Sequence, residues 1–568
     1  MRKLRGLPAS PGIAIGPAFP FRRAALSCRR CTVEDPAAEW ARFQAALDSA
    51  RRQLTDLCER AEAAHQPEPA AILRVQTLIL DDPDLLAGVQ QAIEERALNA
   101  EAALMDVAEA YAQSIEQLPN GTLRARAADV RDAVARVLRL LLGVAESPLA
   151  ALPTPAVILA HDLSPSDTAQ LDRARVLGLC TAEGGPTSHT AILARSLGLP
   201  AVVGAGPAVL DVPAGTSLVL DGDSGELLVE PDEETVAAYR LRQRAAADRL
   251  IEAAHHAHEP AVTRDGRRIA VTANVGSAGE ARAALAAGAE GIGLLRTEFL
   301  YLDRPLPPSE EEQEHAYRAI LDIVGSRPVA LRTLDVGGDK PVACLSLPPD
   351  EANPALGQRA IRLCLAQPAL FKAQLRAALR AAAGRGLKVL FPLVATMDEL
   401  RQARALLEAC RAELRAGGWA AAEPLEIGAM IEVPAAALLA DHLAAEVDFL
   451  SIGTNDLSQY ALAADRANTR VAALADGFQP AVLRLVRMTV EAAHARGKWV
   501  SLCGELAGDP LAVPLLVGLG LDELSMHPAA IPLVKQVIRT VTMADAQRVA
   551  RRALELDSAE AVRVLLNP

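Results

Sequence analysis

The residue with the clearest chemical potential is His189, in the segment Glu-Gly-Gly-Pro-Thr-Ser-His-Thr. The two glycines permit a sharp turn, Thr187 or Ser188 can cap a helix, and residues 191–197 have helical composition. His189 is therefore predicted to lie at or just before a helix N-terminus, where free N–H groups and the helix dipole favour a phosphate. Because neutral imidazole attacks phosphorus without first losing a proton, the position suits a phosphoryl acceptor.

A second group of polar residues in the C-terminal half combines arginines with carboxylates, an amide and a thiol. Arginine forks bind phosphate and carboxylate through paired hydrogen bonds, and Mg²⁺ prefers oxygen ligands together with substrate phosphate. The group therefore predicts a small substrate with several negative charges and a hard divalent cation. Its members are Arg296, Glu298, Arg332, Asp335, Glu432, Asn455, Asp456, Cys503 and Glu505.

The elements expected to hold this group are eight short β-like runs, each followed by helical sequence. Eight consecutive βα units predict a (β/α)8 barrel, and the C-terminal ends of barrel strands face the active site. The polar residues follow the ends of these runs. The runs are 268–274, 291–295, 328–334, 388–394, 426–433, 448–453, 499–504 and 522–526.

His189 is expected in a smaller α/β domain interrupted by a helical bundle. Residues 5–20 read as a short strand that joins the strand-like runs after residue 155, which leaves the Ala/Leu-rich region 34–143 as an insertion. This bundle is acidic and could attract a basic partner, although an ordinary solvated surface explains the charge equally well. A charged helix from residue 231 to about 257 is expected to connect the two halves.

Composition excludes several classes of protein. A length of 568 residues exceeds a single core, and a net charge of −13 argues against nucleic acid as a partner. No apolar run reaches membrane-spanning length and no signal peptide is recognisable, so we expect no membrane insertion and a cytoplasmic location. The eight cysteines are predicted to be reduced thiols. Only Cys28 and Cys31 have a redox-like or zinc-like spacing, and no second Cys/His pair lies nearby.

The segment around His189 continues as Ala-Ile-Leu-Ala-Arg-Ser-Leu-Gly-Leu-Pro-Ala-Val and resembles the phosphohistidine signature of phosphoenolpyruvate-utilising enzymes. The spelling Thr-Ser-His-Thr is closest to the enzyme I family of the bacterial sugar phosphotransferase system. Resemblance to enzyme I covers essentially the full chain, including Gly-Ile-Gly-Leu-Leu-Arg-Thr-Glu-Phe-Leu from residue 291 and Phe-Leu-Ser-Ile-Gly-Thr-Asn-Asp-Leu-Ser-Gln-Tyr from residue 449. One departure is Pro186, where many enzymes I carry Arg, so another group must compensate the charge of a phosphorylated ring.

The resemblance implies a phosphoenolpyruvate-protein phosphotransferase that loads His189 and then a histidine of the carrier protein HPr, the first step of sugar uptake. Thr168 would be the hydrogen-bond partner of His189, and Cys503 would protonate the methylene carbon of the enolate. Glu432 and Asp456 would ligate Mg²⁺, the implied cofactor. The residues implied to bind phosphoenolpyruvate are Arg296, Arg332, Asn455, Asp456, Arg466, Arg359 and Lys340.

The resemblance also implies how the chain is divided. Residues 1–30 and 145–230 would form a swivelling phosphohistidine α/β domain, with residues 33–143 as the inserted helical bundle that binds HPr. Residues 231–260 would form the linker helix. The barrel, residues 261–568, would bind phosphoenolpyruvate and form a homodimer. Because the two sites lie in different domains, the histidine domain must swing to the barrel and away again.

Other functions remain open at this stage. Family members usually read Phe-Glu-Ala-His where this chain has Leu-Arg-Val-Gln at 73–76, so the carrier surface has diverged. A regulatory phosphorelay paralogue of enzyme I would use a different carrier. An enzyme like phosphoenolpyruvate synthase or the dikinase needs an ATP-binding domain, and no Gly-rich phosphate loop precedes His189. A non-catalytic scaffold would not need to retain His189, Cys503, Glu432 and Asp456 together.

Overall fold

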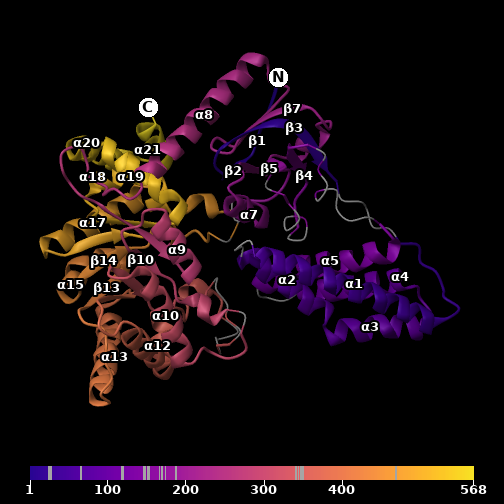
Figure 1. Ribbon diagram of the computed structural model, residues 1–568, viewed down its shortest axis with the longest axis horizontal. Helices are drawn as coiled ribbons and strands as arrows, with labels where there is room; N and C mark the ends of the chain where they lie inside the picture. Colours follow the sequence, from indigo (N-terminus) through magenta and orange to yellow (C-terminus); the bar gives the residue numbers. More distant parts are fainter. Residues whose placement is uncertain are drawn as a thin grey trace. The chain divides into compact units, whose positions relative to one another are not determined.

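Two units make up the chain in the computed structural model, Met1–Ala246 and Ala247–Pro568 (Figure 1). The structure describes residues 1–567 except 23–27, 64–66, 117–120, 145–148, 150–151, 153, 165–166, 168–170, 173, 186–187, 303, 339–341, 343, 346–350, 467 and 469. In helices, only the backbone is described at 60–63, 67–72, 116, 121–126, 128, 189, 192 and 196. Thr168, Pro186 and Lys340 therefore lie outside the described residues.

The C-terminal unit is built on a closed barrel of eight strands, each hydrogen-bonded in parallel to its two neighbours. Strands buried on both faces read as continuous apolar runs, and β11 is buried at every position. All eight predicted runs are confirmed as barrel strands. They are β9 (Ala270–Val275), β10 (Ile292–Leu295), β11 (Val329–Arg332), β12 (Leu387–Phe391), β13 (Leu425–Ile431), β14 (Phe449–Ile452), β15 (Trp499–Leu502) and β16 (Glu523–Met526).

Helices follow the strands and cover the outside of the barrel (Figure 1). Two of the longest, α10 (Glu310–Val324) and α13 (Met397–Ala416), begin at capping boxes formed by Ser309 with Glu312 and by Thr396 with Glu399. The other helices are α9 (Ala278–Ala286), α11 (Ile361–Ala366), α12 (Pro368–Ala381), α14 (Pro434–Leu438), α15 (Ala440–Glu446), α16 (Thr454–Leu462), α17 (Pro480–Ala495), α18 (Val513–Leu519), α19 (Ile531–Thr540), α20 (Met543–Glu555) and α21 (Ala559–Leu566).

The N-terminal unit contains an eight-stranded sheet in the order β1-β8-β7-β3-β4-β5-β6-β2. Strands β3 to β6 run parallel to one another, whereas β7 pairs antiparallel with β3. Residues 2–21 form three strands, where the sequence predicted one, because Gly6 and the Pro11-Gly12 turn interrupt them. The strands are β1 (Arg2–Arg5), β2 (Leu7–Ser10), β3 (Ile13–Phe21), β4 (Ala156–Ala160), β5 (Val176–Thr181), β6 (Ala201–Val203), β7 (Ser217–Asp221) and β8 (Glu226–Val229).

Among the described residues, five α-helices lie between β3 and β4 in the sequence, so the bundle interrupts the sheet as predicted. Alanine and leucine side chains fill its core, and Phe43 and Leu54 are fully buried there. The helices are α1 (Pro36–Ala63), α2 (Pro67–Leu80), α3 (Pro83–Glu94), α4 (Ala100–Glu116) and α5 (Gly121–Leu142). After the sheet, the expected long charged helix is α8 (Glu233–His255). No helix among the described residues is both long and apolar enough to cross a membrane.

Candidate functional site

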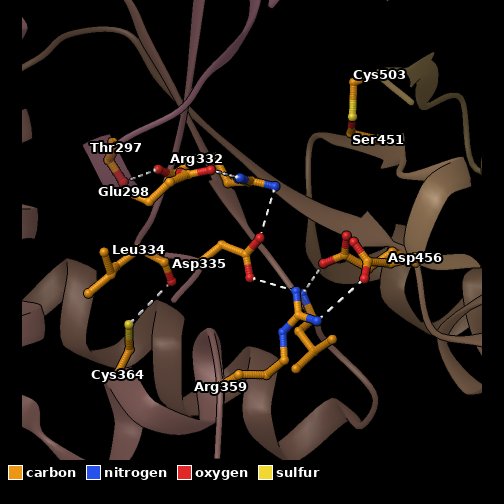
Figure 2. A network of polar contacts seen from close by, with 12 residues as sticks. Thr297, Glu298, Arg332, Leu334, Asp335, Arg359, Cys364, Ser451, Asp456 and Cys503 are labelled. Atoms are coloured by element: carbon orange, nitrogen blue, oxygen red, sulfur yellow. Dashed lines mark hydrogen bonds and ion pairs between the residues drawn. The ribbon is translucent and has the colours of Figure 1, made fainter. Parts of the chain in front are cut away.

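Buried arginines and carboxylates form a continuous network at the C-terminal ends of the barrel strands (Figure 2). Arg332 ends β11, and its guanidinium contacts Glu298 Oε1 at 2.6 Å and Asp335 Oδ2 at 3.2 Å. Asp335 Oδ1 in turn accepts from Arg359 Nη2 at 3.0 Å. The side chains of Asp335 and Arg359 are 0% exposed. Because burying unpaired charges costs several kcal/mol, about 3–5, these groups depend on one another.

Arg359 reaches the network from the segment between η4 (Pro354–Leu356) and α11, and its backbone there is unusual. Ala360, the next residue, has a φ of 51°, a conformation in which only glycine is free of strain. Gly337 has a φ of 102°, and a Cβ on it would lie 2.7 Å from the Cβ of Arg359. Glycine is therefore required for the chain to pass so close to this arginine. From there the Arg359 guanidinium also contacts Asp456 Oδ1, at 3.4 Å.

Glu432 and Asp456 follow β13 and β14 and are both buried. Burial, followed by the charges of Asp456 and Asp335, raises the pKa of Glu432 to about 7. Leu393 N donates to Glu432 Oε1 at 2.5 Å, from a residue with a φ of 55°. Among the described residues no group of three His, Cys, Asp or Glu side chains is placed to hold a metal ion. Two neighbouring carboxylates nevertheless fit Mg²⁺, which usually takes one or two protein carboxylates and completes its shell with water and substrate phosphate.

Cys503 lies one residue beyond β15 and is 6% exposed. Its Sγ accepts from Ser451 Oγ at 3.5 Å, and Asn274 Nδ2 donates to its carbonyl oxygen at 2.9 Å. Burial raises the pKa of the Cys503 thiol to about 11, although the Ser451 hydroxyl and the charge of Arg332 oppose the rise. The thiol is therefore protonated at neutral pH, which is the form a proton donor needs.

Three further predicted residues are partly exposed, with Arg296 and Asn455 shortly after barrel strands and Arg466 in the loop after α16. Arg296 follows β10, and its backbone N–H donates to Val275 at 2.8 Å. Asn455 stands at the start of α16, and its Oδ1 accepts from Glu505 N at 2.9 Å. Arg466 Nη1 approaches Asp456 Oδ2 at 3.4 Å. The barrel thus gathers the predicted binding residues at one end, with the exception of Lys340, which lies outside the described residues.

His189 is the first residue of α7 (His189–Leu197), so the predicted helix N-terminus is confirmed. Ser188 is the N-cap, and its side chain accepts from Ala191 N. Gly198 ends the helix in a left-handed conformation with a φ of 64°. The helix follows β5 at the C-terminal edge of the parallel strands, where α/β folds place ligands. Next to His189, the buried Thr190 donates from Oγ1 to Asp162 Oδ1 at 3.1 Å, which ties the start of α7 to the end of β4.

The segment 73–76 on α2 does not present all of its side chains to solvent. Leu73 and Gln76 are 0% exposed, and Gln76 Nε2 donates to Asp132 Oδ2 at 2.8 Å within the bundle. Arg74 is exposed beside Leu78, whose side chain is 69% exposed. The two line a groove between α1 and α2 together with Thr55, Cys58, Glu59 and Thr77.

Some residues of the site were not singled out from the sequence. Tyr460 accepts from Arg359 Nη1 at 3.2 Å and donates to Ala355 O at 2.6 Å, which joins α16 to the segment before Arg359. Gln374, fully buried on α12, accepts from Leu334 N at 2.9 Å and donates to Thr297 Oγ1 at 3.1 Å. Tyr460 was within a segment similar to enzyme I, whereas Gln374 is an ordinary helix residue and carried no signal.

Known protein families match the chain along most of its length. The family model for the PEP-utilising enzyme, N-terminal, matches residues 5–126, that for the mobile domain residues 152–225, and that for the PEP-binding domain residues 251–543. A solution structure of Enzyme I matches 43% of this chain and 99% of its own chain at 38% identity, with a TM-score of 0.39.

Curated relatives align with almost the whole chain. The phosphoenolpyruvate-protein phosphotransferases of Geobacillus stearothermophilus and of Bacillus sp. (strain S) are 45% and 44% identical over 561 residues, which is 99% of this chain and 97% of each relative. That of Bacillus subtilis (strain 168) is 41% identical over 99% of this chain and 98% of its own length. The chain therefore belongs to the family of phosphoenolpyruvate-protein phosphotransferases.

Proposed function

We propose that this chain transfers the phosphoryl group of phosphoenolpyruvate to His189 and then to a histidine of a carrier protein of the HPr type. The observation that carries the proposal is the buried network of arginines and carboxylates beside Cys503 in the barrel. It provides cations for a substrate that bears phosphate and carboxylate, and a protonated thiol for the product.

The reaction at the barrel follows from these groups. A ring nitrogen of His189 attacks phosphorus, the bond between phosphorus and the enolate oxygen breaks, and the electrons of that bond remain on the enolate. Arg296, Arg332 and Arg466 would hold the phosphate and carboxylate groups, with Asn455 as a further hydrogen-bonding partner. Arg359, Asp456 and Lys340 complete the proposed binding set.

Pyruvate forms when the enolate takes a proton on its methylene carbon. Cys503 would donate this proton, and solvent would restore it to the thiolate. Because the pKa of the Cys503 thiol is raised to about 11, the thiol is protonated again before the next turnover. Asn274 and Ser451 orient the cysteine from its carbonyl and sulfur sides.

We propose Mg²⁺ as the metal, with Glu432 and Asp456 as its protein ligands. The cation would neutralise charge on the transferring phosphate and relieve the repulsion that raises the pKa of Glu432. Arg359 and Arg466, which both approach Asp456 at 3.4 Å, would keep that carboxylate oriented.

The phosphorylated form of His189 would be stabilised by the N-terminus of α7, because its free N–H groups and dipole favour an anion. Thr168 would support the imidazole, and Asp162 would fix the helix start through Thr190. For the carrier we propose the groove between α1 and α2, where Arg74 and Leu78 are exposed. Two copies of the chain would associate through their barrels, which sedimentation velocity can check.

The test is to mix the purified full chain with ³²P-labelled phosphoenolpyruvate and Mg²⁺ and to look for acid-labile, base-stable label. Label should appear on His189 and move to added HPr. The His189→Ala variant should remain unlabelled yet still bind phosphoenolpyruvate. A matched control is His442→Ala, which removes a histidine whose side chain is 66% exposed on the barrel unit and should label normally.

Each other result points elsewhere. Label on the His189→Ala variant would refute the acceptor assignment. Label that stays on the enzyme when HPr is added would favour a regulatory paralogue with another carrier. Labelling that requires ATP would favour a synthase-like reaction.

A further inference from the structure

The C-terminal helix α21 contacts the loop between α16 and α17 through Arg563. Arg563 Nη1 contacts Asp476 Oδ2 at 2.5 Å, and its Nη2 donates to Asp476 Oδ1 at 3.0 Å, so the guanidinium binds both carboxylate oxygens. The Arg563 guanidinium carbon also lies 4.5 Å from the centroid of the Phe478 ring, which is buried. A bidentate pair stacked on an aromatic ring fixes direction as well as distance.

Asp476 belongs to the loop between α16 and α17, and this loop also carries Arg466. Near its start, Arg466 N donates to Gln459 Oε1 at 3.1 Å. Near its end, Asp476 Oδ1 accepts from Phe478 N at 2.9 Å. The loop is thus held at one end by α16 and at the other by the side chain of Arg563.

The same loop packs against the segment that follows Cys503. A Cβ on Gly477 would lie 3.4 Å from the side chain of Leu506, so the loop packs against this side chain at Gly477. Leu506 lies in η6 (Glu505–Gly508), and Asp509 follows directly. Burial raises the pKa of Asp509, and the nearby charges of Arg563, which lowers it, and Asp476, which raises it, act on the same carboxyl group.

We propose that Arg563 is a positioning residue for the barrel site, because its bond to Asp476 fixes the loop that carries Arg466. Through the contact of Gly477 with Leu506, the same bond holds the segment after Cys503. The C-terminal helix therefore acts on substrate binding without touching substrate. This inference rests on the proposed role of the barrel as the phosphoenolpyruvate site.

The position of the pair explains why its effect should be on binding more than on folding. The Arg563 side chain is 41% exposed, and exposed ion pairs add little to stability. Its loss should leave the fold intact but allow the loop a wider range of positions. The substrate must then order the loop when it binds, which weakens apparent affinity.

The test compares Arg563→Met with Arg548→Met in the full chain. Methionine keeps an apolar side chain over Phe478 but removes both hydrogen bonds to Asp476. Arg548 is a matched control, because it pairs with Asp545 one helix earlier on α20 and its side chain is 64% exposed. The Arg563→Met variant should raise the KM for phosphoenolpyruvate about fivefold to tenfold, whereas the control should match the unmodified protein.

Three further readouts separate positioning from general damage. Transfer from already phosphorylated His189 to HPr does not use the barrel, so its rate should be unchanged in Arg563→Met. Asp476→Asn should give the same KM as Arg563→Met, and the double variant should add nothing further, because both remove one interaction. Arg563→Lys keeps the positive charge but cannot form the two parallel hydrogen bonds of a guanidinium group. It should therefore recover part of the phosphoenolpyruvate affinity that Arg563→Met loses.

The outcomes are distinct. An Arg563→Met variant with the KM of the control would overturn the inference, as would a variant that loses carrier transfer and substrate binding together. If the unmodified protein takes no label from phosphoenolpyruvate, that result refutes the proposed function, and the inference about Arg563, which rests on it, is refuted with it. If the unmodified protein is labelled, the KM comparison tests the inference about Arg563 alone.

Discussion

Replacing Asp335 by asparagine is the sharpest perturbation of the barrel network, because it removes one charge and almost no volume. Asp335 stands between Arg332 at 3.2 Å and Arg359 at 3.0 Å, and none of the three side chains is more than 7% exposed. Two buried guanidinium groups would then face each other across a neutral amide, which presents donors to at least one of them.

The size of the effect follows from this burial. Removing one partner of a buried pair costs about 3–5 kcal/mol. Arg332 keeps Glu298 and Arg359 keeps Asp456, so we expect the lower end, about 3 kcal/mol. For a unit of this size, that loss lowers the thermal midpoint of the barrel by roughly 4 °C. A shift of about 1 Å in a substrate-binding arginine also reduces kcat/KM by about 100-fold.

Calorimetry on the full chain measures the first effect, and pyruvate release from phosphoenolpyruvate in the presence of HPr measures the second. The control is Asp322→Asn, which breaks the ion pair between Asp322 and Arg385. Their side chains are 56% and 37% exposed, respectively. Such a pair contributes about 0–1 kcal/mol. The reasoning is refuted if Asp335→Asn unfolds at the temperature of this control, or if it retains kcat/KM within about threefold.

Three other predictions concern the cysteine of the site. Because burial raises the pKa of Cys503 to about 11 and the protonated form is the donor, activity that depends on it should fall only as pH rises toward that value. Iodoacetamide at neutral pH should modify the exposed Cys31 well before Cys503, as mass spectrometry of peptides can follow; equal rates would contradict a protonated, buried thiol. Gly504→Ala would place a Cβ 1.9 Å from Thr454 Oγ1, so it should displace Cys503 and slow pyruvate formation at least about tenfold. Gly279→Ala on α9, where the nearest atom would lie at 3.8 Å, is the control, and similar turnover in both variants would contradict the steric argument.

The barrel was predictable because its signals are local. Each strand is a short apolar run, and each is followed by a helix whose cap or apolar spacing is visible in the sequence. The end of α7 and the position of His189 were predictable for the same reason, since Ser188 and Gly198 mark the helix boundaries directly. The three strands of residues 2–21 were not separated, because turns of one or two residues leave little trace in an apolar pattern.

The network inside the barrel depends on contacts between distant parts of the chain. The sequence placed Arg332 after the third barrel strand and Asp456 after the sixth, so it predicted a shared rim of polar residues, whereas Arg359 was implied only by the resemblance to enzyme I. It could not predict that Asp335 would lie between two arginines, or that Gln374 would hold the backbone behind them. Such contacts depend on side-chain directions at the rim, and the apolar pattern of a strand does not record them.

Segments 73–76 and 559–566 also show which features the sequence predicts and which features depend on the tertiary structure. From the sequence, the replacement of a histidine by Gln76 was a change in the carrier surface, but the fold buries Gln76 against Asp132 and leaves Arg74 exposed. The C-terminal segment carried no functional signal at all, because the chemistry of Arg563 arises only where α21 packs beside the loop of Asp476. The sequence by itself determined the family and most of the helices and strands, and it predicted the reactive residues. The tertiary structure decided which charges are paired and buried, because burial and pairing depend on residues that the chain brings together only when it folds.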